Sequence, residues 1–213
     1  MDFIDKDIES YALEFTSPES ELMKELNRET HLKKLQPRML SGHLQGAFLS
    51  MISKMINPRY ILEIGTYTGY SAIALSKGLK ENGKLITLEF NHEHERMATS
   101  YFEKSEKASQ IEMIIGNAID IIPTLDYKWD LVFIDADKTN YSNYFDLVID
   151  SLPSNSWILA DNVLWSGKVL SNKEDLDPDT QAIKDFNQKV KDDPRVENTL
   201  LPFRDGLLLI RKK

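Results

Sequence analysis

Residues 60–71 read Tyr-Ile-Leu-Glu-Ile-Gly-Thr-Tyr-Thr-Gly-Tyr-Ser, and this stretch decides the fold. Tyr60–Ile64 is a short apolar run typical of a buried strand, and a helical pattern follows near residues 71–80. Gly65 and Gly69 fall in the turn between them, where glycine lets the backbone approach a ligand and leaves amides free at a helix start. A strand, a glycine turn and a helix in this order predict the first unit of an α/β domain.

The same alternation continues toward the C-terminus. Strand-like runs lie at Leu85–Glu89, Ile111–Ile115, Trp129–Ile134 and Trp157–Ala160. Between them lie helical stretches near residues 92–107, 117–122 and 140–151. This alternation predicts parallel βαβ units in a doubly wound, Rossmann-like sheet. After a helix near residues 179–191, Val196–Leu201 and Leu207–Arg211 flank a turn and predict an antiparallel hairpin. We therefore expect a seven-stranded α/β sheet that is mostly parallel.

The segment before the first strand is helical in character. Apolar residues recur at helical spacing in residues 2–35, with an interruption at Ser17-Pro18 that predicts two helices, and Leu44–Ile56 predicts a third. The chain has 213 residues and shows no linker or repeat. We expect one domain, 1–213, in which an N-terminal helical segment, 1–57, precedes the core, 58–213.

Composition excludes several classes of function. A formal net charge of −8 disfavours a nucleic-acid partner, because phosphate backbones attract basic surfaces. The chain contains no cysteine, which excludes disulfides, thiolate metal sites and cysteine nucleophiles. The sequence starts without a signal-peptide pattern, and no apolar run reaches the roughly 18 residues of a spanning helix. These features predict a cytoplasmic protein with no membrane partner.

Two acidic clusters each follow a strand-like run directly. Asp135 follows the run that ends at residue 134, and Asp161 and Asn162 follow the next one. The carboxyl ends of parallel strands form the edge where ligands bind in such sheets. Carboxylate and amide oxygens suit Mg²⁺, with Mn²⁺ or Ca²⁺ as alternatives, and Lys138 lies three residues past Asp135. The alternative is a turn-forming role, because Asp and Asn are common loop residues.

The glycine turn and the end of the second strand predict a nucleoside site. Gly65 and Gly69 do not form a G-x-G-x-x-G loop, since Tyr67 stands at its middle position, and a pyrophosphate would fit poorly. Glu89 ends the second strand, where a carboxylate accepts hydrogen bonds from ribose hydroxyls. A packing turn followed by a solvated glutamate is the alternative.

These motifs together resemble a known family. EIGTYTGYSA at residues 63–72 resembles motif I of the class I S-adenosylmethionine-dependent methyltransferases, and in particular of the cation-dependent O-methyltransferases of the catechol and caffeoyl-CoA type. FIDADK (133–138), LADNVLWSGKV (159–169), AIKDFNQKVKDDPRVE (182–197) and LPFRDGLLLIRK (201–212) are also similar to that family's signatures. The resemblance covers roughly residues 36–213 and implies an S-adenosylmethionine-dependent O-methyltransferase.

The resemblance also implies roles for individual residues. The implied cofactor contacts are Ser41, Glu63, Gly65, Thr66, Ser71, Glu89, Ala118 and Asp135. Among these, Glu89 would bind the ribose and the backbone of Ala118 the adenine, while Asn117 stands where many relatives carry Asp. The implied metal ligands are Asp135, Asp161 and Asn162. The implied catalytic residues are Lys138, as general base, and Asp135.

The implied acceptor is a small aromatic molecule with vicinal hydroxyls, such as a catechol, and the alternative is a hydroxylated uridine in tRNA. Acceptor choice is expected in the loops 37–46 and 163–178, where Trp165 either stacks on the acceptor or anchors the loop. Ser166 stands where plant-type members of the family usually have an Asn that contacts the substrate, so the resemblance does not extend to specificity for caffeoyl-CoA. The resemblance further implies a homodimer. His92 and His94 do not share a helix face and are expected at the surface.

Overall fold

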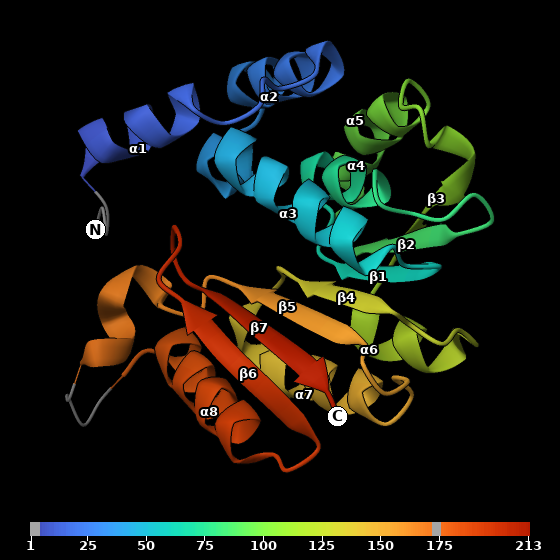
Figure 1. Ribbon diagram of the computed structural model, residues 1–213. Helices are drawn as coiled ribbons and strands as arrows, with labels where there is room; N and C mark the ends of the chain where they lie inside the picture. Colours follow the sequence, from blue (N-terminus) through green and yellow to red (C-terminus); the bar gives the residue numbers. More distant parts are fainter. Residues whose placement is uncertain (1–4, 172–175) are drawn as a thin grey trace.

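The computed structural model describes residues 5–171 and 176–213. A seven-stranded sheet with the order β3-β2-β1-β4-β5-β7-β6 forms its centre (Figure 1). The strands are β1 (Tyr60–Ile64), β2 (Lys84–Glu89), β3 (Ile111–Ile115), β4 (Leu131–Ile134), β5 (Trp157–Asp161), β6 (Val196–Leu201) and β7 (Leu207–Lys212). Strands β1 to β5 pair in parallel, and β7 pairs antiparallel with β5 and β6. The predicted fold class is confirmed.

Helices cover both faces of this sheet (Figure 1). They are α1 (Lys6–Glu14), α2 (Glu21–Lys33), α3 (Gly42–Ile56), α4 (Tyr70–Ser76), α5 (His92–Phe102), α6 (Ala118–Ile121), α7 (Tyr141–Ile149) and α8 (Pro178–Asp192). Successive strand residues point to opposite faces. Ile61 and Leu131 therefore pack with residues of α2 to α5, whereas Leu62 and Val132 pack with residues of α6 to α8. Each fully buried side chain of this kind contributes about 1.5–3 kcal/mol, so both layers hold the sheet firmly.

The N-terminal segment forms the two predicted helices, α1 and α2, which are separated around Ser17-Pro18. α1 buries none of its residues, and the ring of its Tyr11 packs at a tilt on that of Phe15, directly after the helix, with centroids 4.5 Å apart. α2 instead buries Met23 and Leu26 against the sheet-covering helices. Within residues 5–171 and 176–213, the helices are all too short or too polar to cross a membrane.

Two strand boundaries differ from the sequence prediction, and the second of them bears on the site. β4 begins at Leu131 and not at residue 129. The side chain of Asp130 accepts hydrogen bonds from the backbone amides of Arg59 and Tyr60, so Asp130 fastens the start of β1 and precedes the strand. β5 extends to Asp161, which pairs with β7. A predicted metal ligand is therefore part of the sheet itself.

Candidate functional site

Three neighbouring strands carry the acidic residues of the site. β1 lies beside β4, and β4 beside β5. Glu63 is on β1, Asp135 follows the last residue of β4, and Asp161 is the last residue of β5. Parallel strands end at one edge of the sheet, so the sequence-distant acids come together there, as the sequence predicts.

Lys138 lies among these residues. It starts a short 3₁₀ turn, η4 (Lys138–Asn140), and only 7% of its surface is exposed. Its ammonium donates to the side-chain oxygen of Asn162 at 2.9 Å and to Oδ1 of Asp135 at 3.3 Å. It also donates to the hydroxyl of Tyr141 at 2.6 Å. Side-chain oxygens from the residues that directly follow β4 and β5 thus converge on a cationic group.

Asp161 faces the same place from β5. It is 3% exposed, and burial together with the nearby charge of Asp135 raises its pKa to about 6. Two carboxylates held close in a poorly solvated site favour a neighbouring positive charge. Within the described part of the chain no cluster of three His, Cys, Asp or Glu side chains could hold a metal, so a cation here would depend on the amide oxygen of Asn162. Two carboxylates and an amide fit the oxygen-rich coordination of Mg²⁺ or Ca²⁺.

The turn between β1 and α4 closely approaches β4. Gly65 has a φ of 97°, and a Cβ there would lie 2.0 Å from the backbone oxygen of Asp135. A side chain is therefore excluded at this position. Tyr67, between the two glycines, also has a positive φ, 51°. The cofactor turn predicted from the sequence is thus in direct contact with the strand that carries Asp135.

Glu89 holds this turn from the end of β2. Its carboxylate accepts hydrogen bonds from the backbone amides of Tyr67 at 2.8 Å, Thr66 at 3.2 Å and Asn91 at 2.8 Å. Burial alone would raise its pKa, but His94 and the backbone amides of Asn91 and Tyr67 outweigh burial and lower it. Glu89 is therefore ionised at neutral pH, and an ionised carboxylate is a strong acceptor for the hydroxyls of a ribose.

Glu63 is fully buried, and among the described residues its Oε1 has no hydrogen-bond partner. Burial raises its pKa to about 8, although the nearby hydroxyls of Ser71 and Thr87 partly oppose this. An unpaired buried carboxyl is costly, and a ligand that brings a positive charge removes that cost. The amino group at the methionine end of S-adenosylmethionine supplies such a charge, so the residues present fit this cofactor.

The remaining predicted cofactor residues occupy three different segments. Ser41 precedes α3 and is buried, and Ser71 is buried at the start of α4. Ala118 is the first residue of α6, which follows β3. In the sheet, β2 separates β3 from β1. The side chain of Asn117 accepts from the amide of Ile119 and so caps α6. Its oxygen is therefore engaged by the start of α6.

The loop after β5 runs past Lys138. Trp165 and Ser166 both have positive φ angles, 48° and 52°. The ring of Trp165 lies 5.7 Å from the ammonium of Lys138 and 5.8 Å from that of Lys168. Its indole Nε1 is buried and has no hydrogen-bond partner among the described residues. Part of the predicted acceptor loop, residues 172–175, lies outside the described residues.

Three further residues at this edge escape prediction from the sequence. Gln45 on α3 donates to Oδ2 of Asp161 at 2.6 Å, and Arg204 between β6 and β7 donates to Gln45. His94, which is expected at the surface, is instead half-buried: its side chain is 15% exposed and its Nδ1 lies 3.3 Å from the carboxylate of Glu89. No local sequence signal marks these residues, because each depends on a contact between distant segments.

Comparisons with known proteins point to one family. A family model described as O-methyltransferase matches residues 13–213. Caffeoyl-CoA O-methyltransferase 5 of Nicotiana tabacum is 35% identical over 205 residues, which cover 91% of this chain and 85% of the relative. Caffeoyl-CoA O-methyltransferase 2 of Eucalyptus globulus is 36% identical over 205 residues, which cover 91% and 83%. The structure of the Bacillus cereus O-methyltransferase in complex with SAH has a TM-score of 0.90 and 30% identity, and the match covers 97% of each chain.

Proposed function

The chain belongs to the O-methyltransferase family and is an S-adenosylmethionine-dependent O-methyltransferase, and from this we propose that it methylates one of two neighbouring hydroxyls on a small aromatic molecule with the help of a divalent cation. One observation carries the proposal. Asp135 and Asn162, both partly exposed, form a charged cluster with buried Lys138, and Asp135 is in contact with the glycine turn at Gly65. A methyl donor and a hydroxyl acceptor would therefore meet between β1 and β5.

We assign the donor to the β1 side of this edge. Glu63 would pair with the amino group of S-adenosylmethionine, while Gly65, Thr66, Ser71, Ser41 and Asp135 would line its methionine end. Glu89 would accept from the ribose hydroxyls, and the backbone of Ala118 would contact the adenine. The unpaired Oε1 of Glu63 and the ionised state of Glu89 support these assignments.

We assign the cation to Asp135, Asp161 and Asn162. Mg²⁺ is the proposed metal, with Mn²⁺ or Ca²⁺ as alternatives, because all three side chains offer oxygen atoms. When bound, a divalent cation supplies positive charge that lowers the pKa of a coordinated hydroxyl. The raised pKa of Asp161, which is caused first by burial and then by the nearby charge of Asp135, supports this assignment.

We assign the proton transfer to Lys138. Methyl transfer needs an acceptor oxyanion, since a neutral hydroxyl is a weak nucleophile toward a sulfonium. In the proposed reaction Lys138 Nζ takes the acceptor's proton, the oxygen bonds to the methyl carbon, and the carbon–sulfur bond breaks to leave S-adenosylhomocysteine. Lys138 must be uncharged before it takes the proton, and a nearby divalent cation favours that form.

The acceptor is the least constrained part of the proposal. The relatives named caffeoyl-CoA O-methyltransferases point to a phenolic acceptor. Ser166 is exposed and its backbone amide bonds to the carboxylate of Asp205, so this loop is held by the protein itself. We propose a free catechol as the acceptor, since Ser166 departs from the plant-type pattern. Methylation of a hydroxylated uridine in tRNA stays the alternative, and the net charge of −8 counts against it.

The decisive experiment follows methyl transfer from labelled S-adenosylmethionine to 3,4-dihydroxybenzoate or caffeate. We expect activity with Mg²⁺, loss of activity in EDTA and in Asp161→Ala, and retained activity in Asp137→Asn. Asp137 is the matched control, because it is an exposed acid two residues from Asp135 that accepts from Tyr144 and Asn140. Full activity in EDTA would exclude the metal role, and labelling of bulk tRNA alone would favour the alternative acceptor.

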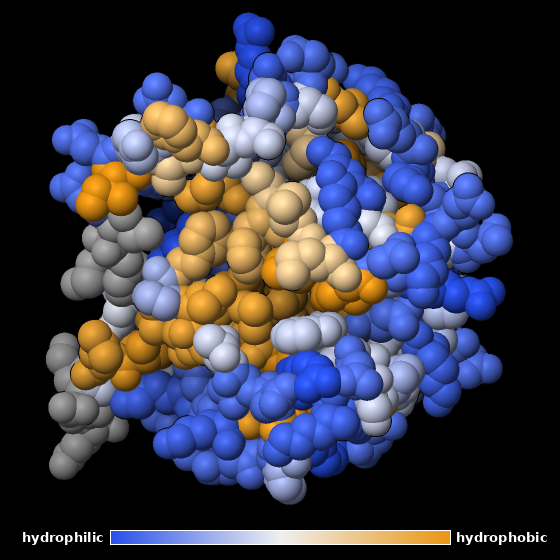
Figure 2. Space-filling view, viewed as in Figure 1, coloured by the Kyte–Doolittle hydropathy of each residue, from blue (hydrophilic) through white to orange (hydrophobic). Residues whose placement is uncertain are grey.

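We also propose a homodimer, supported by one apolar face. Apolar side chains gather over α3 and the β6–β7 hairpin (Figure 2). Met51 and Met55 on α3 are 60% and 77% exposed, and Leu200 on β6 is 36% exposed. Light scattering coupled to gel filtration should give twice the chain mass, and Met55→Asp should shift the protein toward monomer. A monomeric wild-type protein would contradict this proposal.

A further inference from the structure

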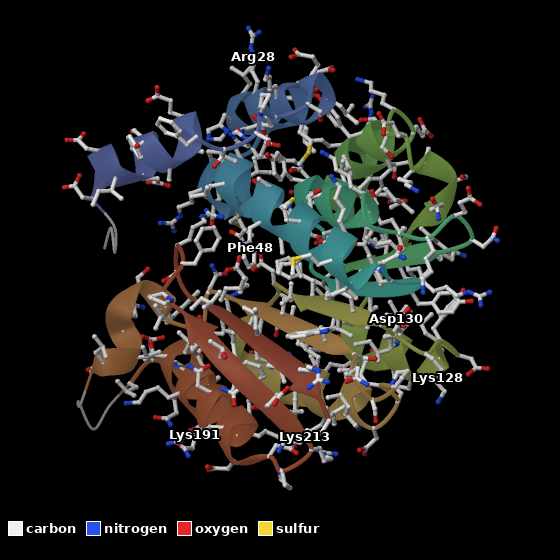
Figure 3. All side chains as sticks on the ribbon, in the orientation of Figure 1. Arg28, Phe48, Lys128, Asp130, Lys191 and Lys213 are labelled. Carbon is white, nitrogen blue, oxygen red and sulfur yellow. The ribbon has the colours of Figure 1, made fainter. Side chains whose placement is uncertain are left out.

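The turn that joins β6 to β7, residues 202–206, is an unexpected part of the site. It reaches toward α3 at the carboxyl edge of the sheet (Figure 1). The ring of Phe203 packs on that of Phe48, with centroids 5.4 Å apart, and the side chain of Phe48 extends from α3 toward this turn (Figure 3). This contact places the neighbouring residue, Arg204, beside the site.

Arg204 binds two segments that the proposed reaction uses. Its Nη1 donates to the backbone oxygen of Ser41 and to the side-chain oxygen of Gln45, and its Nη2 donates to the backbone oxygen of Leu40 at 3.4 Å. Arg204 has a φ of 50°, which costs a non-glycine residue roughly 1–2 kcal/mol. The contacts of its guanidinium and of Phe203 offset this strain.

Gln45 connects Arg204 to Asp161 through hydrogen bonds. Its side chain is 1% exposed, and its Nε2 donates to Oδ2 of Asp161 at 2.6 Å. A guanidinium has donors only, so it can face only the oxygen of an amide. Arg204 therefore fixes which end of the Gln45 amide points at Asp161, and it leaves the NH₂ group as the donor to that carboxylate.

The same turn holds the loop that follows β5. The backbone oxygens of Asp205 and Gly206 accept from the amides of Leu164 at 2.9 Å and Val163 at 3.2 Å. The carboxylate of Asp205 accepts from the amide of Ser166. One turn thus touches the Leu40–Ser41 segment, the partner of Asp161 and the loop that carries Trp165.

We infer that Arg204 and Gln45 are positioning residues that orient Asp161 for a divalent cation, and that Arg204 also holds Ser41 for the methyl donor. The inference rests on the proposed metal site. Gln45 is therefore expected to affect the binding of the cation alone, whereas Arg204 is expected to affect the binding of both the cation and the methyl donor.

The test measures binding without turnover. Mn²⁺ affinity is measured from the free-ion EPR signal, and SAH affinity by calorimetry, for wild type, Gln45→Met, Arg204→Met and the double variant. We expect Gln45→Met to weaken Mn²⁺ binding about tenfold, in line with other groups that orient metal ligands. Arg204→Met should weaken it less, because this change also removes a positive charge that acts on Asp161. The double variant should be no weaker than the worse single one, because both act through one chain of hydrogen bonds. SAH binding should weaken in Arg204→Met and stay unchanged in Gln45→Met.

Arg211→Met is the matched control. Arg211 lies on β7 of the same hairpin, where it pairs with Glu197 and Asn155 away from the site. This variant should bind Mn²⁺ and SAH as wild type does. If Arg204→Met does not fold by circular dichroism, Gln45→Met still tests the effect on Asp161.

The outcomes separate the two proposals. No Mn²⁺ binding by wild type would overturn the proposed metal site. Mn²⁺ binding by wild type that stays within twofold in Gln45→Met would overturn the positioning role. Fully additive losses in the double variant would show that Arg204 and Gln45 act independently, which also overturns it.

Discussion

The ammonium of Lys138 lies 2.6 Å from the hydroxyl of Tyr141 and donates a hydrogen bond to it. Tyr141 is fully buried at the start of α7, and its hydroxyl donates to the backbone oxygen of Asp161 at 2.9 Å. Burial raises the pKa of Tyr141 well above its usual value, so the hydroxyl keeps the proton that it donates. Tyr141 thereby joins the proposed base to the strand that carries the proposed metal ligand.

Tyr141→Phe should therefore lower kcat more than it changes KM. The change leaves Lys138 without its shortest hydrogen bond, and a misplaced catalytic group costs about tenfold or more in rate. The lost hydrogen bonds should also cost about 1 kcal/mol of stability. Steady-state kinetics and thermal melts check both effects. Tyr144→Phe is the control, because the Tyr144 hydroxyl bonds to exposed Asp137, and an equal kcat loss there would contradict the prediction.

Lys138→Met should separate catalysis from cation binding. Loss of a general base lowers kcat by roughly 10²–10⁴-fold. The same change removes a positive charge beside Asp135 and Asn162, so Mn²⁺ should bind more tightly than to wild type. EPR titration and single-turnover assays measure the two effects. Weaker Mn²⁺ binding in Lys138→Met would argue that the lysine helps to form the cation site.

Glu63→Gln should change how the stability of the ligand-free protein depends on pH. The pKa of Glu63 is about 8 in the folded protein, against an ordinary value of 4.5. Between these two pH values the folded state binds a proton that the unfolded chain has released, so stability falls as pH rises through this window. A glutamine side chain cannot titrate, so the free energy of unfolding of the variant, relative to that of wild type, should rise by about 3 kcal/mol from pH 5 to pH 8. Denaturant unfolding at both pH values checks this, and parallel pH curves for the two proteins would contradict it.

Gly65→Ala should destabilise the protein by about 2 kcal/mol or more, because its φ is 97° and the added Cβ would lie 2.0 Å from the backbone oxygen of Asp135. The backbone of Asp135 cannot move aside without disturbing the end of β4. Gly42→Ala is the control, since its φ is also positive, 75°, but a Cβ there meets no atom within 4 Å. Chemical unfolding should therefore show a much larger loss for Gly65→Ala, and equal losses would mean that φ alone matters.

The fold could be predicted from the sequence because its signals are local. β1 and β3 have the predicted bounds, and the hairpin follows the run from Val196. The meeting of Asp135, Lys138 and Asn162 is predictable because parallel strands end at a common edge. Their roles as ligands and base stay predictions.

Residues that act across the fold could not be predicted in this way. Gln45 reads as an ordinary helix residue, and its role depends on Asp161, which is 116 positions away. Arg204 reads as a turn residue close to a proline. Helix periodicity places His94 at the surface, but its imidazole lies against the carboxylate of Glu89. In each case the partner is supplied by tertiary packing, which no local pattern records.

The division of the site between strands and loops bears on how such enzymes diversify. Glu63 and Asp161 belong to strands of the sheet, whereas Trp165 and Ser166 belong to a loop fastened by the β6–β7 turn. Mutation of that loop can change the proposed acceptor site without moving the strand residues proposed for donor and cation binding. A lineage that starts from this scaffold can therefore explore new acceptors while its methyl-transfer chemistry is inherited intact.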